Sequence, residues 1–233
     1  MEFTLLWAAL IAAVFAYAVL RWEADRGNQG CCSGNLWEVA ITSAVAGIFI
    51  GRIVMMLVDG VNPLGHPMDV LLVRSGVSTA GASLGAAAVF AWLSRREPIA
   101  MADGISAAGV AGLAGWQAGC VVRGTCLGTA SGLPWAFAQD GSTVTRHPVG
   151  VYAAILLAFA ALALVWFKAR RSPAAGVAAS LAIVAAAGVR LVTEPLQLSL
   201  SGGPTWFYWS ALAAGSAGTL WFGLIRRRRT ADR

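Results

Sequence analysis

Five arginines in this sequence of 233 residues lie within apolar stretches or in the segments that join them, away from the main arginine clusters. They are Arg52, Arg74, Arg123, Arg146 and Arg190. A guanidinium at the depth of an apolar span costs about 2.5 to 3.5 kcal/mol on insertion scales, so each needs a partner or a function. The planar guanidinium matches the geometry of a phosphate. We therefore expect Arg52, Arg123, Arg146 and Arg190 to converge on an anionic phospholipid headgroup.

Arg190 and Glu194 are four residues apart, which places them on the same face of a predicted helix. The pattern leaves two interpretations open. The two side chains form a plain salt bridge, or the carboxylate orients the guanidinium toward an anionic ligand.

The chain carries two histidines, in different settings. His147 lies between Arg146 and Pro148, five residues before Tyr152, and is either a proton carrier near neutral pH or the cap of a helix end. His66 has no second histidine close in sequence, so we predict no metal site there.

The four cysteines fall into two pairs. Cys31 and Cys32 are predicted in a cytoplasmic loop, where thiols stay reduced, whereas Cys120 and Cys126 lie near the outer face, where a disulfide is chemically permitted. Neither pair has the spacing of a zinc site. The motifs of serine hydrolases, zinc proteases and P-loop enzymes do not occur, so we predict neither a metal nor a cofactor.

The elements that must position these residues are apolar helices. Hydrophobic residues make up 58% of the chain and charged residues 12%, against roughly 25% charged residues in soluble proteins. Runs of about 20 apolar residues recur almost end to end, as membrane spans require. We predict an all-α membrane protein that forms a single polytopic transmembrane domain over residues 1–233. Its seven predicted helices are Phe3 to Leu20, Trp37 to Val58, Val77 to Leu93, Ile99 to Val122, Val149 to Phe167, Pro173 to Val192 and Trp206 to Ile225.

The basic residues predict the orientation of these helices. With the N-terminus outside and the C-terminus inside, twelve of the 17 Lys and Arg residues face the cytoplasm, as the positive-inside rule expects: Arg21, Arg26, Arg95, Arg96, Lys168, Arg170, Arg171, Arg226 to Arg229 and Arg233. This distribution accounts for the net charge of +6 without a nucleic-acid partner. A small transporter is disfavoured, because Asp103 is the one acidic residue predicted well inside a span.

Pairs of glycines four residues apart predict close contacts between helices. They occur at Gly47 and Gly51, at Gly81 and Gly85, and at Gly115 and Gly119. Tight packing alone is the interpretation we favour for most of them.

Three segments together resemble the signature of the prolipoprotein diacylglyceryl transferase family. They are Gly119 to Gly128, then Leu133-Pro134-Trp135, then Arg146-His147-Pro148 with Tyr152. Gly51-Arg52, Asp103, Gly112 and the pair Arg190 and Glu194 agree with the family in order, so the resemblance covers most of the chain. Seven helices with the N-terminus outside match the family too.

The resemblance implies transfer of an sn-1,2-diacylglyceryl group from phosphatidylglycerol to the thiol of a lipobox cysteine in a secreted prolipoprotein. The implied partners are phosphatidylglycerol, the signal-peptide region of the prolipoprotein and membrane lipids. The implied location is the bacterial cytoplasmic (inner) membrane, crossed several times.

Four positions depart from the family pattern. An arginine just before the signature is replaced by Gln117, and polar residues within it are replaced by Cys120 and Thr125. Ala80 stands where the family has a histidine or tyrosine as the presumed proton acceptor. Two hypotheses stay open: a working lipid transferase with substitute groups, or a catalytically impaired relative that binds phospholipid without transferring it.

For the first hypothesis we predict that Arg123 takes over the lost phosphate contact and His147 the proton transfer. The predicted catalytic residues are His147, Arg190 and Arg123. The predicted substrate-binding residues are Arg52, Arg146, Tyr152, Glu194, Gly128 and Trp135.

Overall fold

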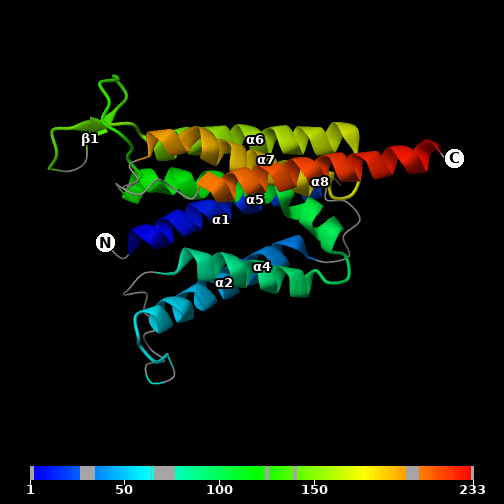
Figure 1. The fold of residues 1–233 in the computed structure, drawn as a ribbon, viewed down its shortest axis with the longest axis horizontal. Coiled ribbons are helices and arrows are strands. Elements are labelled where there is room, and N and C mark those ends of the chain that lie inside the picture. Colours follow the sequence, from blue (N-terminus) through cyan, green and yellow to red (C-terminus); the bar gives the residue numbers. More distant parts are fainter. Residues whose placement is uncertain are drawn as a thin grey trace. The chain divides into compact units, whose positions relative to one another are not determined.

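The computed structural model describes residues 3–26, 35–63, 65, 77–123, 126–138, 141–197 and 205–231. Seven α-helices lie in this part of the chain (Figure 1). They are α1 (Phe3–Asp25), α2 (Leu36–Val58), α4 (Thr79–Leu93), α5 (Pro98–Arg123), α6 (Val149–Arg171), α7 (Val177–Thr193) and α8 (Thr205–Ala231). Each coincides with one predicted helix, and α1, α6 and α8 run further than predicted at their C-terminal ends.

Five of these helices are long and apolar enough to cross a membrane. They are α1, α2, α5, α6 and α7, whereas α4 is a shorter apolar helix. The chain is therefore built as a multi-pass membrane protein.

The helices divide between two compact units. The first unit contains α1, most of α5, α6, α7 and α8, and the second contains α2 and α4.

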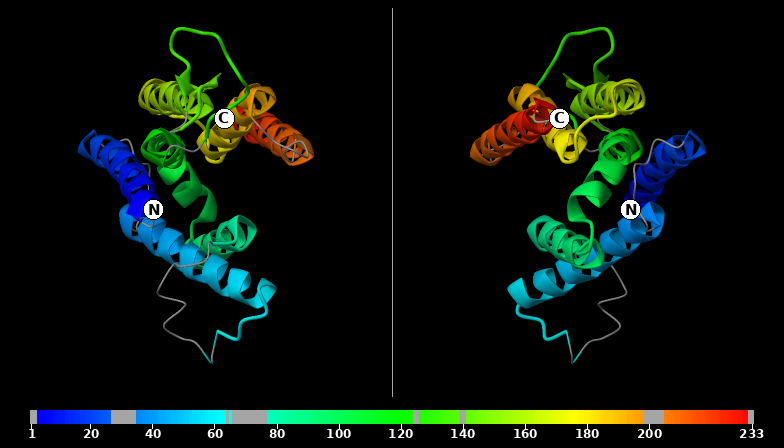
Figure 2. Two further views of the ribbon diagram at one scale, coloured as in Figure 1. Left: turned by 90° about the vertical axis from the view of Figure 1, so that its left-hand side faces the viewer. Right: turned by 90° about the vertical axis from the view of Figure 1, so that its right-hand side faces the viewer.

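Close contact between glycines and small residues holds the second unit together, and Figure 2 shows its two helices side by side. A Cβ atom added at Gly47 would lie 2.7 Å from the carbonyl oxygen of Ala82, and one added at Gly51 would lie 2.8 Å from the nitrogen of Ala82. Asn35 caps α2 and Ser78 caps α4 with side-chain oxygens. The prediction of tight packing at these glycines is confirmed.

The core of the first unit lies between α5 and α6. Small residues on α5 pack against larger ones on α6, among them Ala107, Ala111 and Ala114 with Leu157, Leu164 and Val165. Helix α1 approaches α5 at Gly115 and Gly119, where added Cβ atoms would lie 2.8 and 2.6 Å from the Cα atoms of Ala12 and Ala8. Helix α7 contacts both α6 and α8 (Figures 1 and 2).

A buried ion pair crosses the first unit. Lys168 of α6 lies with Nζ 2.8 Å from Oε1 of Glu23 in α1, and it also donates to the carbonyl oxygen of Gly104 in α5 at 3.3 Å. Both charged residues are buried. A charge pair of this kind is tolerated where further hydrogen bonds compensate for lost solvation.

Asp103 caps a helix that is distant in sequence. Its carboxylate accepts hydrogen bonds from the N–H groups of Gly176, at 2.5 Å, and Ala179, at 2.7 Å, at the start of α7. A carboxylate here satisfies free N–H donors and complements the helix dipole. Asp103 thus finds its polar partners in the backbone at the start of α7.

A small β-hairpin precedes α6. Strand β1 (Phe137–Ala138) pairs antiparallel with β2 (Thr145–Arg146). The prediction of an all-α chain missed this hairpin, because strands of two residues are too short to produce an alternating pattern.

Candidate functional site

Backbone hydrogen bonds join three distant segments of the first unit at one end of its helices. The N–H of Gly128 donates to the carbonyl of His147 at 2.8 Å, and the N–H of His147 donates to the carbonyl of Thr129 at 3.0 Å. The N–H of Thr129 donates to the carbonyl of Leu196 at 2.9 Å. Leu196 ends the 3-10 helix η1 (Glu194–Leu196), which follows α7 directly. The start of α6, the end of α7 and the signature segment therefore form one layer, from which the hairpin extends in Figure 1.

Three predicted site residues form a chain of polar contacts in this layer. The indole Nε1–H of Trp135 donates to the hydroxyl of Tyr152 at 2.8 Å. That hydroxyl lies 3.4 Å from Nδ1 of His147, and the two rings meet edge to face. His147 and Tyr152 are half-buried and Trp135 is exposed. The imidazole is therefore held from one side by a phenol that is itself held by an indole.

Arg146 and Gly128 meet next to this chain. The guanidinium of Arg146 donates from Nη1 to the carbonyl oxygen of Gly128 at 3.3 Å. This contact uses one of the five N–H donors of an arginine. The position of Gly128 requires glycine, because an added Cβ would clash with the carbonyl oxygen of Leu196 and lie 2.5 Å from Cγ2 of Val149.

Arg190 and Glu194 lie where α7 gives way to η1. The N–H of Glu194 donates to the carbonyl of Arg190, and both side chains are half-buried. In the part of the chain that the structure describes, neither side chain takes part in an ion pair. The plain salt bridge is therefore not formed in this structure, and Arg190 lies six residues before Leu196, whose carbonyl accepts from the N–H of Thr129.

We predict that four arginines converge. The structure supports this for Arg146 and Arg190 only, and only through the positions of the segments that carry them. Arg146 and Arg190 belong to segments that meet in the layer described above. Arg52 is 3% exposed in α2 of the second unit. Arg123 ends α5, and its side chain lies outside the described residues, as do Arg74 and His66. The convergence of all four stays a prediction.

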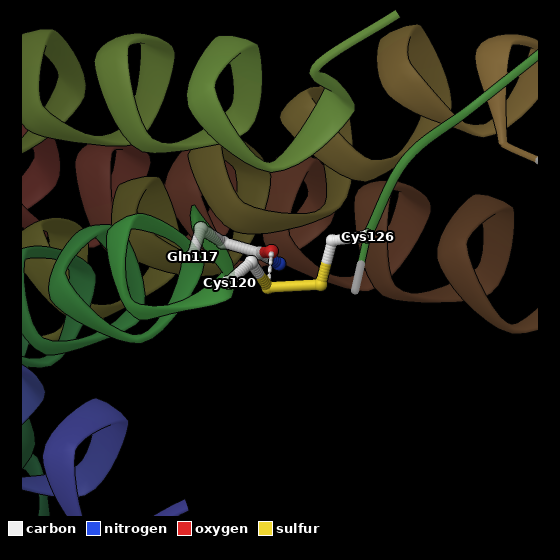
Figure 3. The surroundings of a disulfide bond; sticks show 3 residues. All are labelled: Gln117, Cys120 and Cys126. Carbon is white, nitrogen blue, oxygen red and sulfur yellow. Dashed lines mark hydrogen bonds between the residues drawn. A yellow bond between two sulfur atoms is a disulfide. The ribbon is translucent and has the colours of Figure 1, made fainter. Parts of the chain in front are cut away.

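Cys120 and Cys126 form a disulfide, with Cα atoms 5.7 Å apart. The disulfide that the sequence permits between these two cysteines is thus present. Figure 3 shows the side chain of Gln117 lying against the bond, with Oε1 3.7 Å from Sγ of Cys120. A disulfide sulfur carries no hydrogen, so this is a contact and not a hydrogen bond donated by the cysteine.

The described residues contain no cluster of three His, Cys, Asp or Glu side chains that could hold a metal ion. Sequence reasoning missed the pairing of Lys168 with Glu23 and the capping role of Asp103. The partners in these contacts are 145 and 73 residues apart. Local sequence patterns therefore could not predict these two contacts.

Comparison with known proteins agrees with the arrangement of these segments. The family model for prolipoprotein diacylglyceryl transferase matches residues 4–223. Three similar proteins are each named phosphatidylglycerol–prolipoprotein diacylglyceryl transferase. The protein from Bordetella avium is 26% identical over 94% of this chain and 88% of its own length. The protein from Methylibium petroleiphilum is 30% identical over 68% of this chain and 66% of its own. The protein from Paracidovorax citrulli is 30% identical over 56% and 52%.

The match covers six of the described helices almost in full, the first two thirds of α8, and the layer that holds His147, Tyr152 and Gly128. It therefore does not rest on one short motif or on apolar composition alone. This chain belongs to the prolipoprotein diacylglyceryl transferase family.

Proposed function

We propose that this chain transfers the diacylglyceryl group of phosphatidylglycerol to the lipobox cysteine of prolipoproteins. The observation that carries the proposal is the family match over residues 4–223. The polar chain from Trp135 to His147 supports it, because it offers an oriented proton acceptor although Ala80 occupies the family's presumed acceptor position.

The reaction requires two things of the site, a proton acceptor for the thiol and positive charge for the leaving group. The acceptor thiol, whose pKa is about 8.5 when free, must lose its proton. The thiolate then attacks the glycerol carbon, so that a carbon–sulfur bond forms and the carbon–oxygen bond to the phosphate breaks. The phosphate keeps the electron pair and leaves as a glycerol phosphate anion, which positive groups must stabilise.

In this proposal His147 accepts the proton of the thiol. With its Nδ1–H donating to the Tyr152 hydroxyl, the Nε2 lone pair is left to accept the thiol proton. The indole of Trp135 fixes the phenol by donating to the same oxygen. This is the logic of a base that is oriented by a third group.

Arginines provide the positive charge that stabilises the departing phosphate and binds the headgroup. Arg190 and Arg123 stabilise the departing phosphate, and Arg52 and Arg146 bind the headgroup of phosphatidylglycerol. Guanidinium groups suit this task because they stay charged and bind phosphate through two parallel N–H donors. Glu194 orients Arg190, while Gly128, Trp135 and Tyr152 shape the binding site.

The membrane setting completes the proposal. The chain forms one polytopic domain of seven spans in the bacterial inner membrane, with the N-terminus outside, and the signal-peptide region of the prolipoprotein enters from the lipid. Alkaline phosphatase fused after Arg233 should then be inactive in cells. High phosphatase activity of this fusion would refute the orientation.

Rescue of a transferase-depleted bacterial strain tests the function in cells. The wild-type chain should restore growth and lipoprotein modification, and Arg190→Ala should abolish both. Arg170→Ala is a matched control, because the guanidinium of Arg170 lies 6.0 Å from the ring of Trp166 at the other end of the first unit.

The alternative is a relative that binds phospholipid without transferring it, and it predicts a different result. Phosphatidylglycerol would then copurify with the protein while rescue fails. The similar proteins are all named as transferases, so they do not favour this alternative.

A further inference from the structure

A cleft lies in the first unit, between the end of α6, the start of α7 and the later part of α8. It has a volume of about 410 Å³ and is lined by Phe167, Arg171, Pro173, Ala174, Val177 and Gly223. This volume falls within the range of sites that hold small molecules. Every lining residue except Arg171 is apolar, so the cleft combines hydrocarbon walls with one positive charge.

The cleft and the candidate site lie at opposite ends of α6. The helix begins at Val149, two residues after His147, and ends at Arg171. At 1.5 Å per residue its 23 residues extend over about 33 Å, close to the roughly 30 Å thickness of the hydrocarbon core of a bilayer. Figure 1 shows the hairpin at one end of this unit and the C-terminal end of α8 at the other. The cleft therefore faces the membrane leaflet opposite to that of the candidate site.

Close packing fixes the walls of the cleft. A Cβ added at Gly176 would lie 2.6 Å from Cδ2 of Phe222 in α8, and the φ angle of Gly176 is 92°, a conformation that glycine adopts without strain. The N–H of Gly176 donates to the carboxylate of Asp103. Helices α7 and α8 meet again at Gly215, where an added Cβ would lie 3.0 Å from the carbonyl oxygen of Ser180. The cleft is thus formed by packed helices.

Arg171 supplies the charge of the cleft. Its side chain is exposed, and among the described residues it takes part in no ion pair. Lys168, one turn earlier, differs because it is buried and paired with Glu23. The guanidinium of Arg170 lies 6.0 Å from the ring of Trp166, and Arg170 does not line the cleft. Arg171 is therefore the residue whose charge is available to a ligand in this cleft.

We propose that the cleft binds an anionic phospholipid of the leaflet opposite to the candidate site. Arg171 binds the phosphate, because a guanidinium matches phosphate geometry and stays charged. The glycerol and the upper part of an acyl chain lie against Phe167, Pro173 and Val177. A cation at the mouth of an apolar cleft at the membrane surface is complementary to a lipid, whose phosphate adjoins hydrocarbon. In the orientation proposed above, this is the cytoplasmic leaflet. A lipid held there is not placed for transfer, so this site is additional to the substrate site.

Photochemical labelling of the full-length protein tests the site. Vesicles of phosphatidylcholine contain a trace of phosphatidylglycerol with a diazirine on one acyl chain, and mass spectrometry maps the labelled residues. Label should appear within residues 167–177, and a phosphatidylcholine probe with the same diazirine should label this segment about five- to tenfold less. Equal labelling by the two probes would overturn the proposal. So would loss of the label in excess inorganic phosphate at constant ionic strength, because the site would then be one for free phosphate.

Matched variants distinguish the charge of the cleft from its shape. Arg171→Gln should lower labelling by the anionic probe to the level of the neutral one, whereas Arg170→Gln removes the neighbouring charge and should behave like wild type. Ala174→Phe fills the cleft and should also prevent labelling. Its control is Ala175→Phe, since Ala175 is exposed and does not line the cleft. Should Ala174→Phe fail to fold, the two arginine variants decide. Equal labelling of Arg170→Gln and Arg171→Gln would contradict a site at Arg171.

The outcome does not depend on the proposed function, because labelling requires no transfer. Phosphatidylglycerol is also the proposed substrate, so the probe should label residues near Tyr152 as well, about 33 Å away along α6. Arg171→Gln should leave that second label unchanged. An equal loss of label at both ends of α6 in this variant would refute a separate site. Absence of label near Tyr152, with label kept at residues 167–177, would count against the proposed function alone.

Discussion

At the scale of single residues, the site depends on a few short contacts that fix the orientation of polar groups. The hydroxyl of Tyr152 lies between Nε1 of Trp135 and Nδ1 of His147. The sequence indicated His147 and Tyr152 as candidates because they stand five residues apart at the head of a helix. The contact with Trp135 was not predictable, because it depends on the path of a loop 17 residues away in sequence.

Removing the phenol oxygen tests the role of Tyr152. We expect Tyr152→Phe to lower kcat for diacylglyceryl transfer about tenfold, the effect of one hydrogen bond that orients a base. Tyr208→Phe is the control, because the ring contact of Tyr208 with Phe207 does not need the hydroxyl. Full activity of Tyr152→Phe would show that His147 does not depend on this contact.

Gly128 offers a second test, this time of stability. In Gly128→Ala the new Cβ meets the backbone carbonyl of Leu196, which cannot move without disturbing the end of α7. We expect a loss of about 1–3 kcal/mol, measured by thermal unfolding in detergent. Gly132→Ala should be neutral, because nothing lies within 4 Å of its added Cβ. Equal melting temperatures for the two variants would contradict the close approach at Gly128.

At the scale of elements, the helices were predictable because membrane spans are continuous apolar runs. All seven predicted ranges coincide with helices of the described chain. The helix ends were less predictable: α6 continues through Lys168 to Arg171, since a charged residue can remain helical where it finds a partner such as Glu23. The hairpin was missed because its two strands have no distinctive sequence pattern. They are stabilised by pairing with each other.

Helix packing in the second unit should fail when its glycines are enlarged. A Cβ at Gly51 would lie 2.8 Å from both the nitrogen of Ala82 and the carbonyl oxygen of Ser78. We expect Gly51→Ala to destabilise the protein by about 1–3 kcal/mol in a detergent unfolding experiment. Gly109→Ala, with open space at its Cβ, should be neutral or stabilising by up to about 1 kcal/mol. A stable Gly51→Ala variant would refute the close approach of α2 and α4.

The ion pair between Lys168 and Glu23 connects α6 to α1. Lys168→Met leaves the Glu23 carboxylate buried without its cation, which should cost about 3–5 kcal/mol. Adding Glu23→Leu to this variant should recover most of the loss, because no buried charge then remains. The free energies of unfolding of both variants provide the comparison. A double variant as unstable as the single one would show that packing, and not charge, holds these helices.

At the scale of the whole molecule, membership of the family was predictable from motifs spread along most of the chain. The departures at Gln117, Cys120 and Ala80 were also visible in the sequence. The sequence also indicated His147 and Arg123 as substitute groups, and their roles stay predictions. What it could not give are the contacts of His147, because the 3.4 Å approach of the Tyr152 hydroxyl to Nδ1 depends on the fold.

The central claim is that this chain is a working transferase despite those departures. Its most direct test is mass spectrometry of a lipobox peptide incubated with purified protein and phosphatidylglycerol of one acyl composition. The account predicts a mass gain of one diacylglyceryl group on the cysteine, with glycerol phosphate released in equal amount and no gain on a peptide that carries serine instead. An unmodified cysteine after incubation with well-folded, oxidised protein that binds phosphatidylglycerol would contradict it.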